Sequence, residues 1–214
     1  MKISISVPEK VREILKKFEE AGHEIYIVGG VVRDAILGKE LYDWDFTTNA
    51  TPEQILKLFP DAFYDNKFGT VGIKNEEGRP YEITTYRKEF GYSDARRPDR
   101  VEWGKSLEED LARRDFTINA MALRSIQPSA LSSQRSKFEL IDLYNGQKDL
   151  QDKLIRAVGD PMERFGEDAL RMMRAIRIAA QLGFAIEEKT LGAIKSNADQ
   201  IYKIAPERIR DELL

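Results

Sequence analysis

The sequence predicts an α+β protein with a small mixed sheet in a first domain, residues 1–150, and an all-helical second domain, residues 151–214. Two observations predict this division. Short runs with strand character alternate with helical segments in the first part, and from Pro161 the pattern is helical almost to the end. The chain has no internal repeat, and its 214 residues are enough to bury a core in one large or two small domains.

The first half of the chain alternates helices and strands. A helix is expected after Pro8, because apolar residues follow at helical spacing: Val11, Ile14, Leu15 and Phe18. Residues 24–30 predict a buried strand that runs into a glycine turn, and the helix that follows ends at Gly38. Residues 43–48 alternate polar and apolar side chains, as a half-buried strand does, and Thr51-Pro52 begins another helix.

The later elements are predicted in the same way. Residues 70–74 and 81–87 read as two strands joined by a hairpin turn, and residues 88–105 as a polar, mobile loop. Ser106 to Glu109 forms a capping box that begins a helix. The segment 127–137 looks like a surface insertion before a strand at 138–143, and the later helices are expected to break near Gly183 and Pro206.

Composition excludes several classes of protein. The hydrophobic share of 42% and the charged share of 33% are typical of a folded globular chain. Without cysteine there are no disulfides, thiolate metal sites or cysteine nucleophiles, which is compatible with the cytoplasm. No apolar run reaches membrane-spanning length, and the first residues lack the apolar core of a signal peptide. A net charge of −3 means that any nucleic-acid surface must be local.

Three motifs carry candidate chemistry. The first is the run from Gly29 to Asp34, directly after a predicted strand. Paired glycines let backbone amides approach a phosphate, the following helix points its N-terminus at the anion, and Arg33 adds a cation. Such turns also occur for steric reasons alone, so this motif by itself leaves both interpretations open.

The second motif is Asp43-Trp44-Asp45. Residues i and i+2 of a strand point to the same face, so both carboxylates project together and repel each other unless a cation lies between them. Oxygen ligands of this kind suit Mg²⁺, with substrate phosphates as further ligands. A lone pair of this spacing more often belongs to an edge strand exposed to water, but the nearby glycine turn favours the metal interpretation.

The third motif combines Arg113-Arg114-Asp115 with the segment 164–177, predicted as one continuous helix. One apolar stripe is expected on that helix: Ala169, Met172, Met173, Ile176, Ala179 and Ala180. Glu167, Arg171 and Arg174 would lie opposite, with Asp168 beside Arg171 at i, i+3. The simpler interpretation is a solvated face of ion pairs. Because the segment carries four arginines on a helix rich in apolar residues, we favour a functional role for this face instead.

Together these motifs resemble the class II tRNA nucleotidyltransferases, the superfamily of CCA-adding enzymes and bacterial poly(A) polymerases. The family pattern is G-G-x-V-R-D, a spaced D-x-D, R-R-D-F-T-x-N-A, E-D-x-x-R and a later E-R. These motifs occur here in order at Gly29–Asp34, Asp43/Asp45, Arg113–Ala120, Glu167–Arg171 and Glu207-Arg208. The resemblance covers nearly all of the chain from residue 24 onward and implies a pol β-like head followed by an all-α neck.

The resemblance also implies an activity. Asp43 and Asp45 would hold two Mg²⁺ ions for attack of a tRNA 3′-hydroxyl on the α-phosphate of CTP or ATP, and pyrophosphate would leave. Glu82, expected on a neighbouring strand, is the candidate third catalytic carboxylate. The residues implied in nucleotide binding are Gly29, Gly30, Arg33, Arg114, Asp115, Asn119, Glu167, Asp168, Arg171, Arg174 and Arg177.

The choice of C and A can be argued independently of the family. Both bases present an amino donor beside an unprotonated ring nitrogen, whereas G and U present the reverse pattern. A carboxylate that accepts from the amino group and a guanidinium that donates to the ring nitrogen would select C and A together, and Asp168 and Arg171 are the candidate pair.

Two segments bear on the extent of the activity. In the family a flexible loop at 88–105 takes part in the switch from C to A addition, and here it carries Arg96, Arg97 and Arg100; the alternative is a polar loop without that role. Family members continue into helical body and tail domains, so we expect a chain ending at Leu214 to be a truncated form with weakened tRNA binding.

Three other functions compete with the CCA-adding interpretation. The nearest is a poly(A) polymerase or an A-adding enzyme built on the same head. A second is a related nucleotidyltransferase that acts on a small molecule or a protein. The third is a non-catalytic RNA-binding or assembly module, against which the retention of both Asp43 and Asp45 counts.

Overall fold

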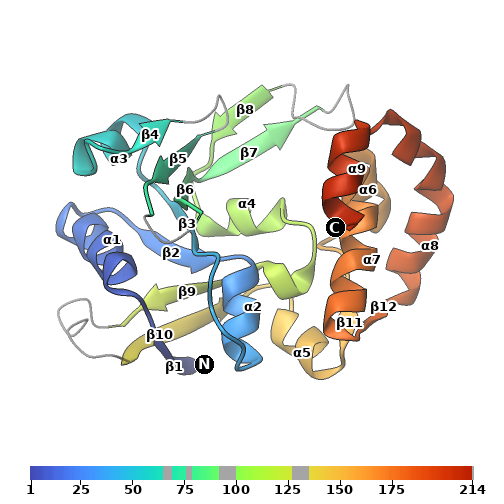
Figure 1. Cartoon of the computed structure of the whole chain (residues 1–214), viewed down its shortest axis with the longest axis horizontal. Coiled ribbons are helices and arrows are strands. Elements are labelled where there is room, and N and C mark those ends of the chain that lie inside the picture. Colours follow the sequence, from blue (N-terminus) through green and yellow to red (C-terminus); the bar gives the residue numbers. More distant parts are fainter. Residues whose placement is uncertain (65–68, 76–78, 92–99, 127–134, 214) are drawn as a thin grey trace. The chain divides into compact units, whose positions relative to one another are not determined.

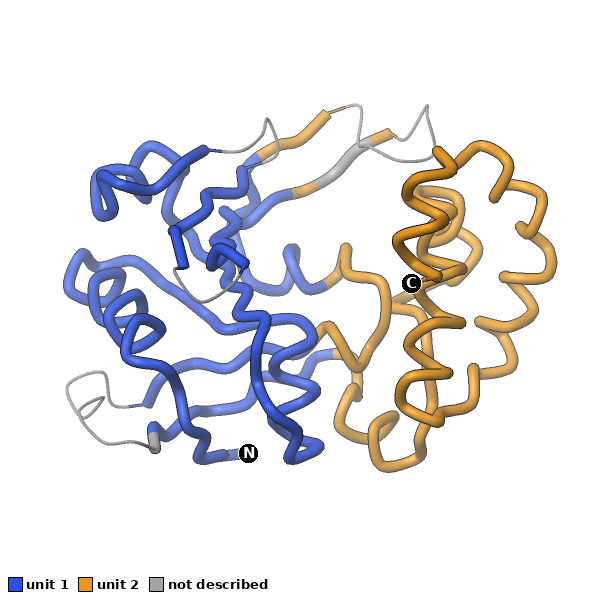
Figure 2. Tube along the Cα trace, in the orientation of Figure 1, with its two compact units in different colours: residues 1–87, 103–111, 121–143 blue, residues 88–102, 112–120, 144–214 orange. Residues whose placement is uncertain are grey.

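In the computed structural model of the chain, the described residues are 1–64, 69–75, 79–91, 100–126 and 135–213. Their contacts form two compact units, coloured separately in Figure 2. Unit 1 comprises Met1–Arg87, Trp103–Leu111 and Met121–Leu143; unit 2 comprises Lys88–Glu102, Ala112–Ala120 and Tyr144–Leu214. The domain boundary expected at residue 150 stays a prediction.

Unit 1 is built on a mixed sheet, as the sequence predicts. Among the described residues its strands run in the order β1-β10-β9-β2-β3-β6-β5-β4 (Figure 1). Their bounds are β1 Lys2–Ser6, β2 Ile25–Val28, β3 Asp45–Thr48, β4 Phe63–Tyr64, β5 Thr70–Ile73, β6 Tyr81–Thr85, β9 Met121–Ser125 and β10 Arg135–Asp142. Strands β3 and β6 are parallel and the other pairs are antiparallel.

The helices of this part of the chain are α1 Glu9–Glu20, α2 Gly30–Ile36, α3 Pro52–Leu58 and α4 Leu107–Ala112. The prediction for α1 is confirmed, because it buries the expected face: Val11, Ile14, Leu15 and Phe18. Helix α3 begins with a complete capping box between Thr51 and Gln54, which satisfies two backbone donors at its start. Helices α1 and α2 both contact β2, the strand that leads into the glycine turn.

Several predicted strands differ from those observed. Strand β1 was not expected, although its apolar and polar residues alternate as in a half-buried strand. Strand β3 begins at Asp45, and Phe46, Thr47 and Thr48 are all buried. The predicted alternation is therefore wrong for a physical reason: β3 lies between β2 and β6 in the interior of the sheet.

The two expected loops are shorter than predicted. Strands β7 Arg87–Phe90 and β8 Arg100–Trp103 pair into a separate two-stranded sheet within the expected loop 88–105. Residues 92–99, with Arg96 and Arg97, lie outside the described residues. Strand β10 starts inside the expected insertion 127–137, whose residues 127–134 also lie outside the described part.

Unit 2 is mainly helical. Its helices are α5 Gly146–Gln151, α6 Pro161–Glu167, α7 Leu170–Leu182, α8 Glu188–Asn197 and α9 Pro206–Leu213, with short 3₁₀ turns at Thr117–Asn119 (η1) and Ala198–Lys203 (η3). The two-residue strands β11 Leu154–Ile155 and β12 Ala185–Ile186 pair in parallel. The expected break at Gly183 is confirmed: this residue ends α7 with a φ of 67°, a conformation that glycine adopts readily.

The continuous helix expected over 164–177 is wrong. Asp168 has extended angles, φ −141° and ψ 106°, and separates α6 from α7. The apolar stripe is also wrong in part. Met172, Ala175 and Ile178 form the buried face, whereas Ile176 is 53% exposed and Ala180 is exposed. The arginines of α7 have acidic partners within unit 2, described below. In the described part of the chain, no helix is long and apolar enough to cross a membrane.

Candidate active site

The candidate catalytic carboxylates lie at one end of three neighbouring strands of unit 1. Asp43 lies just before β3 and is exposed, and Asp45 is the first residue of β3. The parallel register of β3 and β6 places Asp45 opposite Glu82, and the antiparallel register of β2 and β3 places Val28 opposite Asp45. The expected position of Glu82 on a neighbouring strand is therefore confirmed.

The three carboxylates line one cavity of about 200 Å³. Its lining consists of Tyr42, Asp43, Trp44, Asp45, Arg79, Pro80, Tyr81 and Glu82. Trp44 and Tyr81 are almost fully buried and form the apolar support of the cavity. The sequence predicted the carboxylates but not Arg79, whose Nη1 lies 3.9 Å from Oδ2 of Asp43. A basic residue just before the strand of Glu82 was the available signal.

The oxygen donors of this cavity fit a magnesium ion whose remaining ligands come from a substrate and from water. Among the described residues, no three His, Asp or Glu side chains gather closely enough to form a protein-only metal site. Mg²⁺ commonly uses only one or two protein carboxylates together with waters and substrate phosphates. Two carboxylates in one polar cavity match that donor set, so Asp43 and Asp45 remain the candidate ligands.

The glycine turn lies beside these carboxylates. Gly29 directly follows Val28, the cross-strand neighbour of Asp45, and its φ of 81° is a conformation that other residues rarely adopt. Arg33 donates to both carboxylate oxygens of Asp34 at 2.9 Å. A Cβ added at Gly30 would lie 3.4 Å from Arg33 Nη2, so the small residue leaves room for the guanidinium. The first motif thus adjoins the second.

The break between α6 and α7 gives Asp168 and Arg171 different side-chain partners from those expected. An Asp168 oxygen caps α7 by accepting from the backbone N–H of Leu170 at 3.0 Å, and Arg208 of α9 donates to the other oxygen at 3.0 Å. Arg171 instead pairs with Glu167 at 2.5 Å. Its guanidinium also donates to the backbone oxygens of Arg164 and Arg113, at 3.2 and 3.1 Å.

The ion pairs of the simpler interpretation do form, but the face at Arg171 is not solvated. The side chain of Arg171 is only 12% exposed, so its orientation is fixed by three acceptors instead of by water. The pair expected at i, i+3 does not form through side chains, yet both groups are held by defined partners. Arg208 belonged to the later E-R motif and had no assigned role; only the fold brings it to Asp168.

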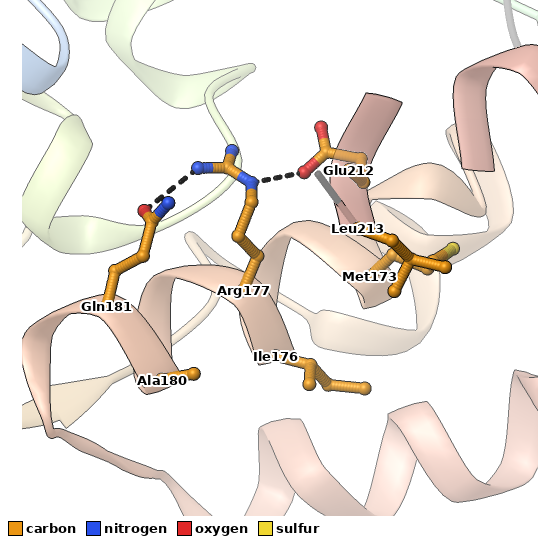
Figure 3. Close-up of a pocket in the computed structure, with 7 residues that line it drawn as sticks. All are labelled: Met173, Ile176, Arg177, Ala180, Gln181, Glu212 and Leu213. Carbon is orange, nitrogen blue, oxygen red and sulfur yellow. Dashed lines mark hydrogen bonds and ion pairs between the residues drawn. The ribbon is translucent and has the colours of Figure 1, made fainter. Parts of the chain in front are cut away.

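The other arginines of α7 also have partners. Arg174 contacts Asp115 at 2.7 Å, and Asn119 donates to the same carboxyl group at 3.2 Å. Arg177 contacts Glu212 of α9 at 2.5 Å and Gln181 at 3.0 Å (Figure 3). It lines a cavity of about 370 Å³ with Met173, Ile176, Ala180, Gln181, Glu212 and Leu213. Glu212, which the sequence reasoning missed, lies one helical turn after Arg208.

A partly buried network of hydrogen bonds and ion pairs holds the Arg113–Ala120 motif within unit 2. Thr117 donates to Asp149 at 2.7 Å, and its backbone N–H donates to the carbonyl of Arg156 at 2.9 Å. Arg156 in turn contacts Asp149 and Glu187. Arg114 lies half-buried next to Asp115. The structure therefore groups the predicted nucleotide residues Arg114, Asp115, Asn119, Glu167, Asp168, Arg171, Arg174 and Arg177 in unit 2.

The ionisation of Asp115 follows from this environment. Burial raises the pKa of its carboxyl group. The charge of Arg174 and hydrogen bonds from Arg174, Asn119 and the backbone of Phe116 lower that pKa by more than burial raises it, so the net pKa lies below its usual value. A carboxyl group whose pKa is lower in the folded than in the unfolded protein stabilises the fold at pH values above the unfolded pKa, which is about 3.9. That contribution is lost as the pH falls through the folded pKa.

We therefore expect Asp115→Asn to lower the free energy of unfolding at pH 7, because it removes the buried carboxylate that pairs with the half-buried Arg174. The loss should be constant from pH 7 to 5 and should shrink below about pH 4, where Asp115 takes up a proton in the unfolded chain but is still ionised in the folded protein. Urea unfolding at a series of pH values measures it. Asp152→Asn, which removes an exposed surface partner of Lys148, is the control and should have little effect. A deficit independent of pH down to pH 2 would contradict the assignment.

Comparison with known proteins agrees with this arrangement. Residues 25–156, more than half of the chain, match the family model described as the poly A polymerase head domain. Residues 183–214 match a model described as the probable RNA and SrmB-binding site of polymerase A. The CCA-adding enzymes of Limosilactobacillus reuteri and Levilactobacillus brevis are 52% and 50% identical in sequence to this chain, and each match covers 96% of the chain.

Solved structures give the same result. The CCA-adding enzyme of Bacillus stearothermophilus in complex with CTP superposes with a TM-score of 0.79 at 37% identity, over 96% of this chain and 47% of that one. A tRNA nucleotidyltransferase with a primer tRNA and an incoming ATP analog gives a TM-score of 0.70 at 33% identity, over 95% and 54% of the two chains. The chain spans about half the length of the curated relatives it matches, 48% and 49% for the two named above. With one family model over more than half of its residues and relatives this similar over nearly all of them, the chain belongs to the class II CCA-adding enzyme family.

Proposed function

We propose that the chain is the catalytic half of a tRNA nucleotidyltransferase that adds C and A to the 3′ end of tRNA from CTP and ATP. The observation that carries this proposal is the register of three neighbouring strands, which brings the glycine turn, Asp45 and Glu82 to one end of the sheet. A phosphate-binding turn beside a carboxylate cluster is the arrangement that nucleotidyl transfer needs.

In this function Asp43 and Asp45 hold Mg²⁺ in the cavity of unit 1, and Glu82 supplies a further negative group. Bound Mg²⁺ would neutralise the phosphates of the nucleotide and lower the pKa of the attacking hydroxyl group. The 3′-oxygen of the primer forms a bond to the α-phosphorus, the bond from that phosphorus to the β-phosphate oxygen breaks, and pyrophosphate leaves. Gly29, Gly30 and Arg33 bind the phosphates from the turn beside Asp45.

Selection of the base is assigned to unit 2. Asp168 accepts from the amino group of C or A and Arg171 donates to the ring nitrogen. The fixed positions of both groups support this role, since rigid partners are needed to reject G and U. Arg208 and Glu167 would hold the two groups in place. Arg114, Asp115, Asn119, Arg174 and Arg177 complete the nucleotide-binding set as proposed from the family motifs.

The alternative is addition of A alone, as in a poly(A) polymerase, for which the matching head-domain model is described. The curated relatives named above favour the CCA-adding function. A location in the cytoplasm, where tRNA is matured, is part of the proposal.

The experiment that tests the function offers tRNA lacking its last three nucleotides to this chain, and to a form extended to the length of its relatives, with each labelled nucleotide in turn. Incorporation of two C residues followed by one A supports CCA addition. Incorporation of A alone, or of several A residues, supports the alternative. Absence of all four incorporations in both forms would refute catalysis.

A further inference from the structure

Arg79 is a cation at the edge of an otherwise acidic cavity. Of the described residues that line this cavity, three are carboxylates and Arg79 is the only cationic side chain. It lies two residues before Tyr81, where β6 begins, and three before Glu82. Neither the family motifs nor the argument for catalysis assigns it a role.

The contact between Arg79 and Asp43 is poorly suited to a structural role. The two charged groups are 3.9 Å apart, and their side chains are 86% and 68% exposed. Ion pairs this exposed contribute little to folding stability because water and salt screen them. The guanidinium of Arg79 can therefore leave the carboxylate of Asp43 at a small cost in free energy. We expect its main effect to be on the electrostatic potential of the cavity, and so on the ions that bind there.

The same carboxylate is the candidate magnesium ligand. An ion pair with Arg79 and coordination of a divalent cation both draw on the negative charge of Asp43, and the two cations would repel each other if both lay beside that carboxylate. A bound nucleotide brings a triphosphate to the same cavity, and guanidinium groups bind phosphate oxygens through directed donors. The displaced side chain then has an acceptor within the site.

We propose that Arg79 is a nucleotide-binding residue of this site that exchanges Asp43 for the triphosphate when a divalent cation binds. The proposal rests on the proposed function, because it needs Asp43 as a metal ligand. Arg79 opposes binding of the cation alone and favours binding of the cation together with a nucleotide. It makes the two affinities depend on each other.

The test uses the 214-residue chain itself and reads binding instead of catalysis. Free Mn²⁺ is titrated against the protein and followed by electron paramagnetic resonance, and CTP binding in the presence of Mg²⁺ is followed by calorimetry. Arg79→Gln removes the charge and keeps a polar chain; we expect it to bind Mn²⁺ roughly three- to tenfold more tightly at low ionic strength, and CTP with Mg²⁺ several-fold more weakly. Arg79→Lys should lie close to the unchanged protein in Mn²⁺ affinity.

Two control variants distinguish a failure of the proposed role of Arg79 from a failure of the proposed metal site at Asp43. Arg124→Gln removes another exposed arginine of unit 1, paired with Glu139 on the neighbouring strand, and should leave both affinities unchanged. Asp43→Asn should remove most of the Mn²⁺ binding; if it does not, the proposed metal site itself is wrong. If Asp43→Asn behaves as expected but Arg79→Gln leaves Mn²⁺ affinity unchanged, or tightens Mn²⁺ without weakening CTP, the exchange proposal is overturned.

Discussion

Replacement of Asp43 or Asp45 by alanine should abolish the proposed nucleotide transfer, in this chain and in a form extended to the length of its relatives, while leaving the fold intact. Asp43 is exposed and precedes β3, and Asp45 is the first residue of that strand, so neither side chain is part of the core. Loss of a metal ligand removes several kcal/mol of transition-state stabilisation, on the order of a 10³-fold loss of rate or more. The measurement is single-turnover incorporation of labelled CMP into tRNA lacking its 3′ end, with thermal unfolding as the test of folding.

A matched control for this prediction is available elsewhere in unit 1. Asp61→Ala removes an exposed carboxylate just after α3, outside the lining of the cavity, and should retain normal turnover. Normal turnover of Asp43→Ala under Mg²⁺ would rule out the proposal that this residue binds the catalytic ion. A loss caused by unfolding would appear as a lower melting temperature in the same sample.

The second large effect is expected at Asp168. Asp168→Ala should lower the preference for C over U by tenfold or more, because it removes the acceptor for the amino group and the repulsion that a U carbonyl would meet. It should also release Arg208 and the cap of α7, so a general loss of rate is expected in addition. The measurement is kcat/KM for CTP, UTP, ATP and GTP on one primer.

The geometry provides a control that sequence reasoning did not contain. Arg208→Ala removes the partner of Asp168 but keeps the carboxylate, so it should weaken binding of all four nucleotides and reduce the preference for C less than Asp168→Ala does. Arg171→Ala should lower the preference for C over U in the same way as Asp168→Ala does. A uniform drop across the four nucleotides for Asp168→Ala would leave that residue a structural role and refute base recognition.

Local patterns in the sequence were enough where neighbouring residues decide the structure. The face of α1 was predicted residue by residue because helical spacing of Val11, Ile14, Leu15 and Phe18 needs no distant partner. The cap at Gly183 follows from the left-handed conformation that glycine favours. Carboxylates two residues apart after a glycine turn likewise predicted a metal site, which stays a prediction; the structure places both residues in the lining of one cavity.

Features decided by distant residues were missed. The segment around Asp168 has good helix formers on both sides, and the break there is accompanied by an ion pair with Arg208, forty residues later. The burial of Thr47 and Thr48 depends on which strands flank β3, and alternation within the segment carries no information about flanking strands. The place of Arg79 just before the strand of Glu82 was only a weak signal, because its relation to Asp43 arises only when β6 joins β3.

The parallel pairing of β3 and β6 also bears on how the protein folds. Hairpins such as β5–β6 close a short stretch of chain and form within microseconds. Joining β3 to β6 instead closes the long segment between Asp45 and Glu82, whose loop entropy must be lost before any contact repays it. The complete cavity, with Glu82 opposite Asp45, should therefore form late in refolding, after most of the helical signal has been recovered. A chaperone that shields the unpaired edges of β3 and β6 during this interval would raise the yield of active protein more than its stability.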